Sequence, residues 1–183
     1  MQNILIIISG KATSGKSEAA KILKEYSNKE IKVFSFATKL KQIAEELFNW
    51  DGDKNIYYEK NEPIRNKGRQ LLINVGQQMR WIQWDVWTQY LKKQIEQWFE
   101  NSSDKIAIID DCRFLDEITT MKKINNSYSI RIIRNVKTID DISEKNLDSY
   151  NDYDYIIYNY GTIDDLKEKI INIYNQILEK TND

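Results

Sequence analysis

The sequence contains no histidine, one cysteine (Cys112) and one proline (Pro63) among its 183 residues. Without an imidazole the chain cannot use a histidine general base or a Ser-His-Asp triad, and nearly all zinc sites are excluded. A single thiol cannot form an internal disulfide, which is typical of a reducing compartment. The first residues also lack the basic and small-residue pattern of a signal peptide. We therefore expect a cytoplasmic protein.

Charge is balanced over the chain, since 27 basic and 28 acidic side chains give a formal net charge of -1. No global positive field is available for duplex DNA or an anionic membrane. The longest apolar run, Ile4 to Ile8, is much too short to cross a bilayer. We expect one domain, with neither nucleic acid nor a membrane as its partner.

Short β-branched runs alternate with longer amphipathic stretches, which indicates an α/β fold with a five-stranded, mostly parallel sheet and helices on both faces. The strand candidates are residues 4–9, 31–36, 105–110, 129–133 and 155–159. The helix candidates are residues 17–25, 38–48, 68–79, 86–99, 116–124 and 163–178. Two polar stretches, 49–66 and 135–153, are longer than ordinary connections, so we expect functional or disordered loops there.

The segment from Gly10 to Ser17 has the spacing G-x-x-x-x-G-K-[ST] of a phosphate loop. Its glycines let successive backbone N–H groups turn toward a phosphate, while Lys16 supplies a positive charge and Ser17 a hydroxyl ligand for Mg²⁺. The helix expected after it adds its positive dipole end. The alternative is a turn that binds nothing. The sequence predicts an ATP-binding loop of Gly10, Lys11, Ala12, Thr13, Ser14, Gly15, Lys16 and Ser17.

Two carboxylates, Asp110 and Asp111, end the strand candidate 105–110, and Arg113 and Glu117 follow. Ligands of parallel sheets gather at the carboxyl edge, so these carboxylates could hold Mg²⁺ directly or through water. The alternative is a helix N-cap followed by a surface arginine.

Arg134 ends the next strand candidate at the same edge, where it could reach a transferring phosphoryl group. Strand alternation points Arg131, three residues earlier, to the other face. The alternative for both residues is a structural salt bridge.

Basic side chains are concentrated between residues 60 and 93, where guanidinium groups could hold an acceptor phosphate bidentately. Lys92 and Lys93 fit a solvated helix face better. Trp81, Trp84 and Trp87 recur every third residue. We expect the set to pack, and the alternative is that one ring lines an acceptor pocket. The basic residues are Lys60, Arg65, Lys67, Arg69, Arg80, Lys92 and Lys93, against Glu62 and Asp85.

Several motifs, in this order, resemble the phage-type deoxynucleoside monophosphate kinases, a branch of the P-loop nucleoside monophosphate kinases, over most of the chain. Two positions depart from the family. Thr38-Lys39 stand in place of the usual Asp-Pro, and Ile142 stands where a histidine commonly precedes Ser-Glu. Beyond the phosphate loop, the motifs are Phe34-Ser35-Phe36-Ala37 with Leu40-Lys41, residues 69–76 leading to Asp85-Val86-Trp87, Asp111-Cys112-Arg113-Phe114 with Glu117, Ser143-Glu144, and residues 154–159 with Gly161-Thr162.

The resemblance implies a single P-loop kinase domain with a nucleotide-acceptor insert at about 49–84 and a lid at about 135–153. It places Asn159 and Gly161 near the ATP base. Together with the motifs, it assigns catalysis to Lys16, Arg113, Arg134 and Asp111, and Mg²⁺ to Ser17 and Asp111. The acceptor would be bound by Phe36, Arg65, Arg69, Arg80, Trp87, Asp111 and Glu117.

These residues predict a kinase that uses ATP and Mg²⁺ to convert a (deoxy)nucleoside monophosphate to the diphosphate, in the host cytoplasm if the source is viral. Whether it forms a homodimer is left open. One alternative is another small-molecule P-loop kinase, of the dephospho-coenzyme A or phosphomevalonate kinase type. A weaker alternative is a nucleic-acid-dependent ATPase, because Ile108-Ile109-Asp110-Asp111 looks like the magnesium strand of a motor.

Overall fold

The computed structural model describes residues 2–48, 62–135 and 145–182, with the backbone alone at 48, 62–69 and 182. The chain divides into two compact units. The first consists of Met1–Ser35 and Tyr90–Asp183, and the second of Phe36–Gln89. Among the described residues, no helix is both long enough and apolar enough to cross a membrane.

The first unit is built on a parallel sheet in the order β2-β3-β1-β4-β5, in which every neighbouring pair is parallel. The central strand β1 is apolar and buried from Ile4 to Ile8, because β3 and β4 pair with its two edges and helices cover both of its faces. The predicted five-stranded α/β fold is confirmed. The strands are β1 (Ile4–Ser9), β2 (Glu30–Phe34), β3 (Lys105–Cys112), β4 (Ser127–Ile133) and β5 (Tyr155–Tyr158).

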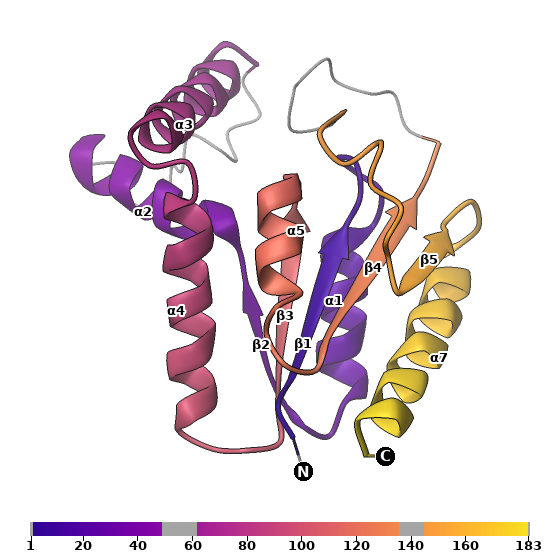
Figure 1. The fold of residues 1–183 in the computed structure, drawn as a ribbon. Helices are drawn as coiled ribbons and strands as arrows, with labels where there is room; N and C mark the ends of the chain where they lie inside the picture. The colour runs from indigo at the N-terminus through magenta and orange to yellow at the C-terminus, as the bar shows by residue number, and fades with distance from the viewer. Residues whose placement is uncertain (1, 49–61, 136–144, 183) are drawn as a thin grey trace. The chain divides into compact units, whose positions relative to one another are not determined.

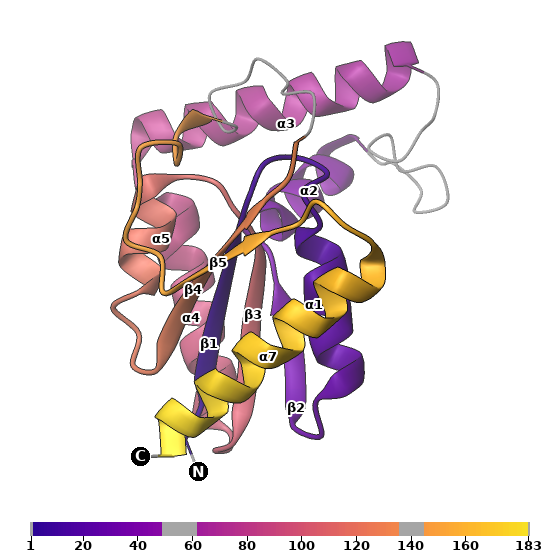
Figure 2. The same cartoon turned by 90° about the vertical axis from the view of Figure 1, so that its right-hand side faces the viewer.

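Helices cover both faces of this sheet (Figures 1 and 2). On one face α1 (Lys16–Tyr26) and α7 (Ile163–Asn182) pack Leu23 and Ile170 against Ile6. Successive side chains of a strand point to opposite faces, so Leu5 and Ile7 face the other layer. That layer contains α5 (Leu115–Met121) and the part of α4 (Val86–Glu100) that belongs to the first unit.

Because the strands are parallel, all of their carboxyl ends meet at one edge of the sheet (Figure 1). The phosphate loop leaves β1 at this carboxyl edge, Asp110 and Asp111 are close to the end of β3, and Asn159 follows β5. The opposite, amino edge carries Asn3 before β1 and Asn126 before β4. Most of the predicted site residues of the first unit therefore lie at one edge.

The second unit contains α2 (Phe36–Phe48), α3 (Glu62–Ile82) and the beginning of α4. Helix α3 begins earlier than predicted, so residues 62–66 are helical and not part of a long loop. Pro63 is compatible with that start, because a helix's first turn leaves backbone N–H groups unpaired in any case. Phe36, predicted to end a strand, begins α2.

The tryptophan spacing is misleading in this unit. Trp87 is buried and its Nε1 donates to the Gly76 carbonyl oxygen at 3.1 Å. Trp81 and Trp84, in contrast, are 84% and 64% exposed. The expectation of packing is confirmed for Trp87 and wrong for Trp81 and Trp84. Because α3 ends at Ile82 and α4 begins at Val86, the three residues do not share one helix face.

Candidate functional site

The phosphate loop makes the turn from β1 into α1, and two glycines make this turn possible. Gly15 has a φ of 109°, in the left-handed region, and a Cβ there would lie 2.8 Å from Asn159 Nδ2. A Cβ at Gly10 would lie 2.6 Å from the carbonyl oxygen of Ile132. Thr13 also has a left-handed φ, of 61°. When left-handed residues alternate with ordinary ones, successive backbone N–H groups turn toward one point. This is the geometry of an anion-binding loop.

Lys16 places its positive charge inside this loop. Its side chain is 7% exposed, and Nζ donates to the carbonyl oxygens of Gly10 at 2.7 Å and Lys11 at 2.8 Å. The ammonium is thus held where successive backbone groups converge. A buried cation beside the N-terminus of α1 is an arrangement that favours anions, and the net charge of the chain does not reveal it.

The adjacent carboxylates at the end of β3 have different partners. Asp110 accepts a hydrogen bond from Ser17, the last residue of the phosphate loop. Asp111 accepts one from Ser35 Oγ at 2.6 Å. Sequence reasoning assigned Mg²⁺ to Ser17 and Asp111, whereas the structure brings Ser17 together with Asp110. The position of Asp110 at the end of the strand candidate marked it as a candidate ligand. The sequence could not decide whether Asp110 or Asp111 faces the phosphate loop.

The electrostatics of Asp110 fit a cation nearby. Burial raises the pKa of its carboxyl above the ordinary 3.8, and the charge of Asp111 raises it further. The hydrogen bond from Ser17 and the charge of Lys16 act in the opposite direction. A buried carboxylate whose charged form is disfavoured gains most from a bound cation, and the hydroxyl and carboxylate oxygens are ligands that Mg²⁺ accepts.

Glu117 has a structural role in the turn after β3. Its side chain is 3% exposed, and Oε2 accepts the backbone N–H groups of Arg113 at 2.7 Å and Phe114 at 3.0 Å. These bonds fix the turn that follows Asp111 and begin α5. Glu117 thereby places Arg113 at the carboxyl edge; a direct contact of Glu117 with an acceptor stays a prediction.

Arg131 and Arg134 of the β4 region differ in their surroundings. Arg134 is exposed at the carboxyl edge, directly after β4. The side chain of Arg131 is 13% exposed, and its Nη1 donates to Ser9 Oγ at 2.9 Å. Ile130 and Ile132 pack in the layer with α1 and α7, so alternation puts Arg131 on the opposite face. Of these two arginines, Arg134 is the exposed one and Arg131 the one with partners inside the first unit.

Asn159 supports the phosphate loop from β5. It is 4% exposed, its Nδ2 donates to the Ser14 carbonyl oxygen at 2.8 Å, and its own N–H donates to the Ile133 carbonyl oxygen at 2.8 Å. Close by, a Cβ at Gly161 would overlap the carboxylate of Asp165, which caps the start of α7. The structure therefore gives Asn159 a contact with the loop itself; proximity to the ATP base stays a prediction.

The candidate acceptor residues belong to the second unit, with the exception of Asp111 and Glu117. Phe36 and Trp87 are buried, and Nη1 of Arg80 lies 3.4 Å from the carbonyl oxygen of Trp84. Arg65 and Arg69 are on α3, but their side chains lie outside the described part of the chain. The range 49–84 falls within this unit.

The predicted lid, 135–153, is described only at residue 135 and from residue 145 onward. In that second part Leu147 is buried, Asn146 Oδ1 accepts the N–H of Leu115 at 2.8 Å, and Lys122 Nζ donates to the Asp152 carbonyl oxygen at 2.9 Å. These contacts hold the segment 145–153, here called the return segment, to the two ends of α5. The remaining residues of the predicted lid, 136–144, lie outside the described residues.

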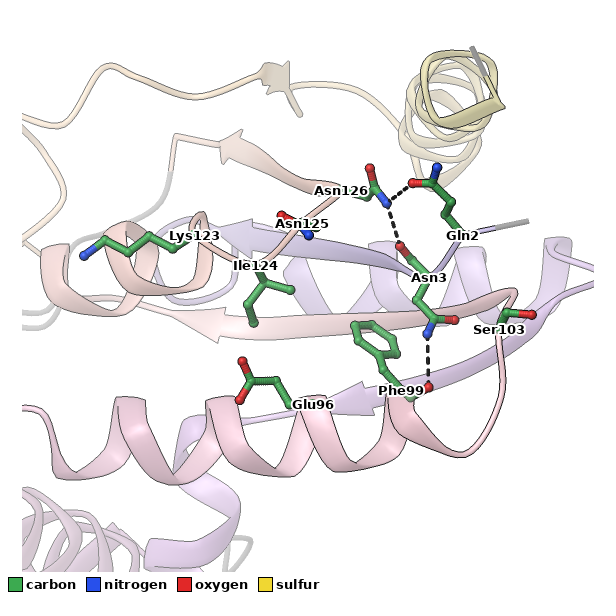
Figure 3. A pocket seen from close by; sticks show the side chains of 9 residues that line it. All are labelled: Gln2, Asn3, Glu96, Phe99, Ser103, Lys123, Ile124, Asn125 and Asn126. Carbon is green, nitrogen blue, oxygen red and sulfur yellow. Dashed lines mark hydrogen bonds between the residues drawn. The ribbon is translucent and has the colours of Figure 1, made fainter.

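A cavity of about 490 Å³ lies at the amino edge, away from the phosphate loop (Figure 3). Asn3 and Asn126 line it together with Glu96, Phe99 and Lys123. Its amides are used to join backbone segments: Asn3 Nδ2 donates to the carbonyl oxygens of Phe99 and Ser102, both at 3.2 Å. No phosphate-loop residue lines this cavity, so we separate it from the candidate site.

Comparisons with known proteins show a shared fold but no family. No protein-family model matches the sequence, and a comparison with curated protein sequences found no match. The crystal structure of TT1252 from Thermus thermophilus has a TM-score of 0.53 and 13% identity, covering 96% of this chain and 98% of that one. This likeness shows a shared fold.

Two shikimate kinase structures are more distant. The enzyme from Acinetobacter baumannii, in complex with shikimate, has a TM-score of 0.42 and 11% identity, covering 98% of this chain and 94% of that one. The enzyme from Bacteroides thetaiotaomicron has a TM-score of 0.27 and 16% identity, covering 97% and 78%. Both TM-scores are below 0.5, so we draw no conclusion about this chain from either structure. What is established is an α/β fold with a phosphate-loop motif at the carboxyl edge of its sheet.

Proposed function

We propose that this chain is an ATP-dependent kinase whose acceptor is a (deoxy)nucleoside monophosphate. The observation that carries the proposal is the buried ammonium of Lys16 within the phosphate loop, next to the Ser17–Asp110 pair at the end of β3. Transfer of a phosphoryl group needs positioning and neutralisation of charge more than a proton shuttle, so a chain without histidine can perform it.

In the proposed reaction, an oxygen of the acceptor phosphate forms a bond to the γ-phosphorus of ATP. The bond from that phosphorus to the bridging oxygen breaks, and ADP leaves with the electron pair. Lys16 neutralises charge on the phosphates, and the backbone N–H groups of the loop bind them. Arg113 and Arg134, at the carboxyl edge, would spread the charge of the transferring group.

The side chains that would hold Mg²⁺ are Ser17 and Asp110. Among the described residues there is no group of three or more Asp, Glu, Cys or His side chains that could hold a metal alone, so nucleotide phosphates would complete the coordination. When bound, Mg²⁺ would neutralise phosphate charge. Asp111 accepts its hydrogen bond from Ser35 and would not hold Mg²⁺; it would instead orient the acceptor.

The choice of acceptor rests on the family resemblance and on the arginines of α3. We propose that residues 49–84 form the acceptor-binding insert and residues 135–153 the lid of a single kinase domain. Arg65, Arg69 and Arg80 would bind the acceptor phosphate through paired donors, a geometry that lysine cannot reproduce. The proposed partners are ATP and the nucleoside monophosphate, without nucleic acid.

The experiment is a panel of ribo- and deoxyribonucleoside monophosphates incubated with ATP and Mg²⁺, with both ADP and nucleoside diphosphate quantified. We expect one or a few of them to give the two products in equal amounts, and Lys16→Ala to serve as the blank. Shikimate, dephospho-coenzyme A and phosphomevalonate are included in parallel. Turnover of one of these alone would replace the acceptor class, and ADP release that depends on added DNA would overturn the kinase.

A further inference from the structure

One carboxylate joins the phosphate loop to the return segment. Asp148 Oδ2 lies 3.1 Å from Nζ of Lys11, and Oδ1 lies 3.4 Å from Nη2 of Arg131. The exposed fractions of these side chains are 44% for Asp148, 29% for Lys11 and 13% for Arg131. A single acidic side chain thus binds two cations from different elements, one of them within the nucleotide-binding motif.

The bridge acts on both sides of Gly10. Lys11 follows Gly10 directly, and Ser9, which precedes it, accepts the hydrogen bond from Arg131 Nη1 at 2.9 Å. The carbonyl oxygens of Gly10 and Lys11 are the two acceptors of the Lys16 ammonium. Asp148 and Arg131 therefore bind the side chains of the two residues that flank Gly10, and the backbone of this stretch fixes the position of Lys16.

Asp148 is itself well anchored. Its neighbour Leu147 is buried, and Asn146 binds the first backbone N–H of α5. Further along the return segment, the Tyr153 hydroxyl lies 3.4 Å from Ser9 Oγ, and the Arg131 guanidinium lies over the Tyr153 ring at 5.7 Å. The carboxylate is therefore a fixed point with contacts on both sides, and Lys11 is tied to it.

We infer that Asp148 is a positioning residue that sets the affinity of the phosphate loop for nucleotide through Lys11 and Arg131, without touching the nucleotide. This inference rests on the proposed function. For the effect of removing Asp148 on nucleotide affinity, it predicts the opposite sign to Coulomb repulsion alone. A carboxylate near bound phosphates weakens their binding by Coulomb repulsion, so its removal would tighten binding. If Asp148 positions the loop, its removal weakens binding.

The test is the dissociation constant of MgADP, measured by calorimetry on the full chain, together with KM and kcat. We expect Asp148→Asn to raise the dissociation constant about fivefold, with a similar rise in KM for ATP and little change in kcat. Asp148→Glu should restore part of the affinity. Added salt should shrink the difference between wild type and Asp148→Asn, because the bridge is partly exposed.

Asp152→Asn is the matched control. Asp152 lies on the same segment and pairs with Lys122 at 3.3 Å, and its side chain is 85% exposed. We expect this variant to bind MgADP as the wild type does. A second check is the double variant Lys11→Met with Asp148→Asn. Adding Asp148→Asn to Lys11→Met should lower the affinity by a smaller factor than Asp148→Asn does in the wild type, because only the contact with Arg131 is left to lose.

Each other outcome contradicts the inference. Tighter MgADP binding by Asp148→Asn would show that charge repulsion dominates. Equal effects of Asp148→Asn and Asp152→Asn, or a lower unfolding temperature with unchanged affinity, would reduce Asp148 to a structural contact. Failure of the wild type to bind MgADP would overturn the proposed function as well, whereas normal binding with an unaffected Asp148→Asn variant would overturn this inference alone.

Discussion

Two asparagines at opposite edges of the sheet both donate hydrogen bonds to backbone carbonyl oxygens, with different consequences. Asn159, at the carboxyl edge, donates to the carbonyl oxygen of Ser14 in the phosphate loop. Asn3, at the amino edge, donates to Phe99 and Ser102 and accepts the N–H of Lys105 at 2.9 Å. Each joins distant backbone segments, but only the first of the two binds the phosphate loop. Similar bonds therefore support the candidate site at one edge and join structural segments at the other.

The difference lies in the groups that surround each asparagine. At the carboxyl edge the ammonium of Lys16 and the carboxylate of Asp110 are both held near the loop, and the Ser14 hydroxyl is buried with no hydrogen-bond partner among the described residues. At the amino edge the side chains of Asn3 and Asn126 bind backbone carbonyls. A buried ammonium inside a loop of anion-binding geometry, and not a cavity alone, marks the carboxyl edge as the candidate site.

The largest expected effect comes from removing the charge of the carboxyl edge. Lys16→Ala should lower kcat by about 10²–10³-fold, because a donor aimed at the transferring group is lost. The unfolding temperature should also fall, because the carbonyl oxygens of Gly10 and Lys11 lose the hydrogen bonds from Nζ. Steady-state kinetics and thermal unfolding check this, with Lys21→Ala as control, since that lysine is 63% exposed on the same helix. Near-normal activity of Lys16→Ala would remove Lys16 from the chemistry.

The next effect separates the two carboxylates of β3. Asp110→Asn should raise the Mg²⁺ concentration needed for half-maximal activity at least about tenfold, because Asp110 is the partner of Ser17. Asp111→Asn should leave the Mg²⁺ requirement near that of the wild type and raise the KM of the acceptor. Magnesium titrations of both variants measure this. Reversed results would return the metal to Asp111.

A smaller effect compares the two asparagines directly. Asn159→Ala leaves the Ser14 carbonyl unpaired in a buried place, so it should cost about 1–3 kcal/mol of stability and also raise the KM for ATP severalfold. Asn3→Ala should lower stability without changing that KM. Urea unfolding and kinetics on both variants are the measurement. A raised ATP KM in Asn3→Ala would break the proposed division between the edges.

The smallest effect is expected for a charge at the amino-edge cavity. Lys123 is exposed there, and Lys123→Ala should shift the unfolding temperature by no more than about 2 °C and leave ATP kinetics unchanged. A clear loss of nucleotide affinity in this variant would make the cavity part of the site.

Local signals in the sequence were sufficient for the parts of the molecule where neighbours along the chain decide the structure. The apolar run of β1 and the glycines of the phosphate loop predict their own conformations, and the structure has both. Long-range pairings were not predictable. Asn159 and Ser14 are 145 residues apart, and Lys11 and Asp148 are 137 apart. No periodicity or motif links such pairs.

Two errors have physical causes that a sequence reader could anticipate. Pro63 suggests a helix boundary, yet the first turn of α3 accommodates it, so the expected loop was too long. A spacing of three residues suggests one helix face only if the helix continues, and Trp81 and Trp87 lie on different helices. The different roles of the adjacent Asp110 and Asp111 could be distinguished only in the structure, because β3 continues through both residues.

The most direct test of the contrast between the edges is backbone hydrogen exchange with and without MgADP. The account predicts slower exchange in residues 10–17 when nucleotide binds, because their N–H groups then donate to phosphates. Residues 123–126, at the amino-edge cavity, should exchange at the same rate in both samples. Slower exchange at residues 123–126, or no change in residues 10–17, would contradict the assignment of nucleotide binding to the carboxyl edge.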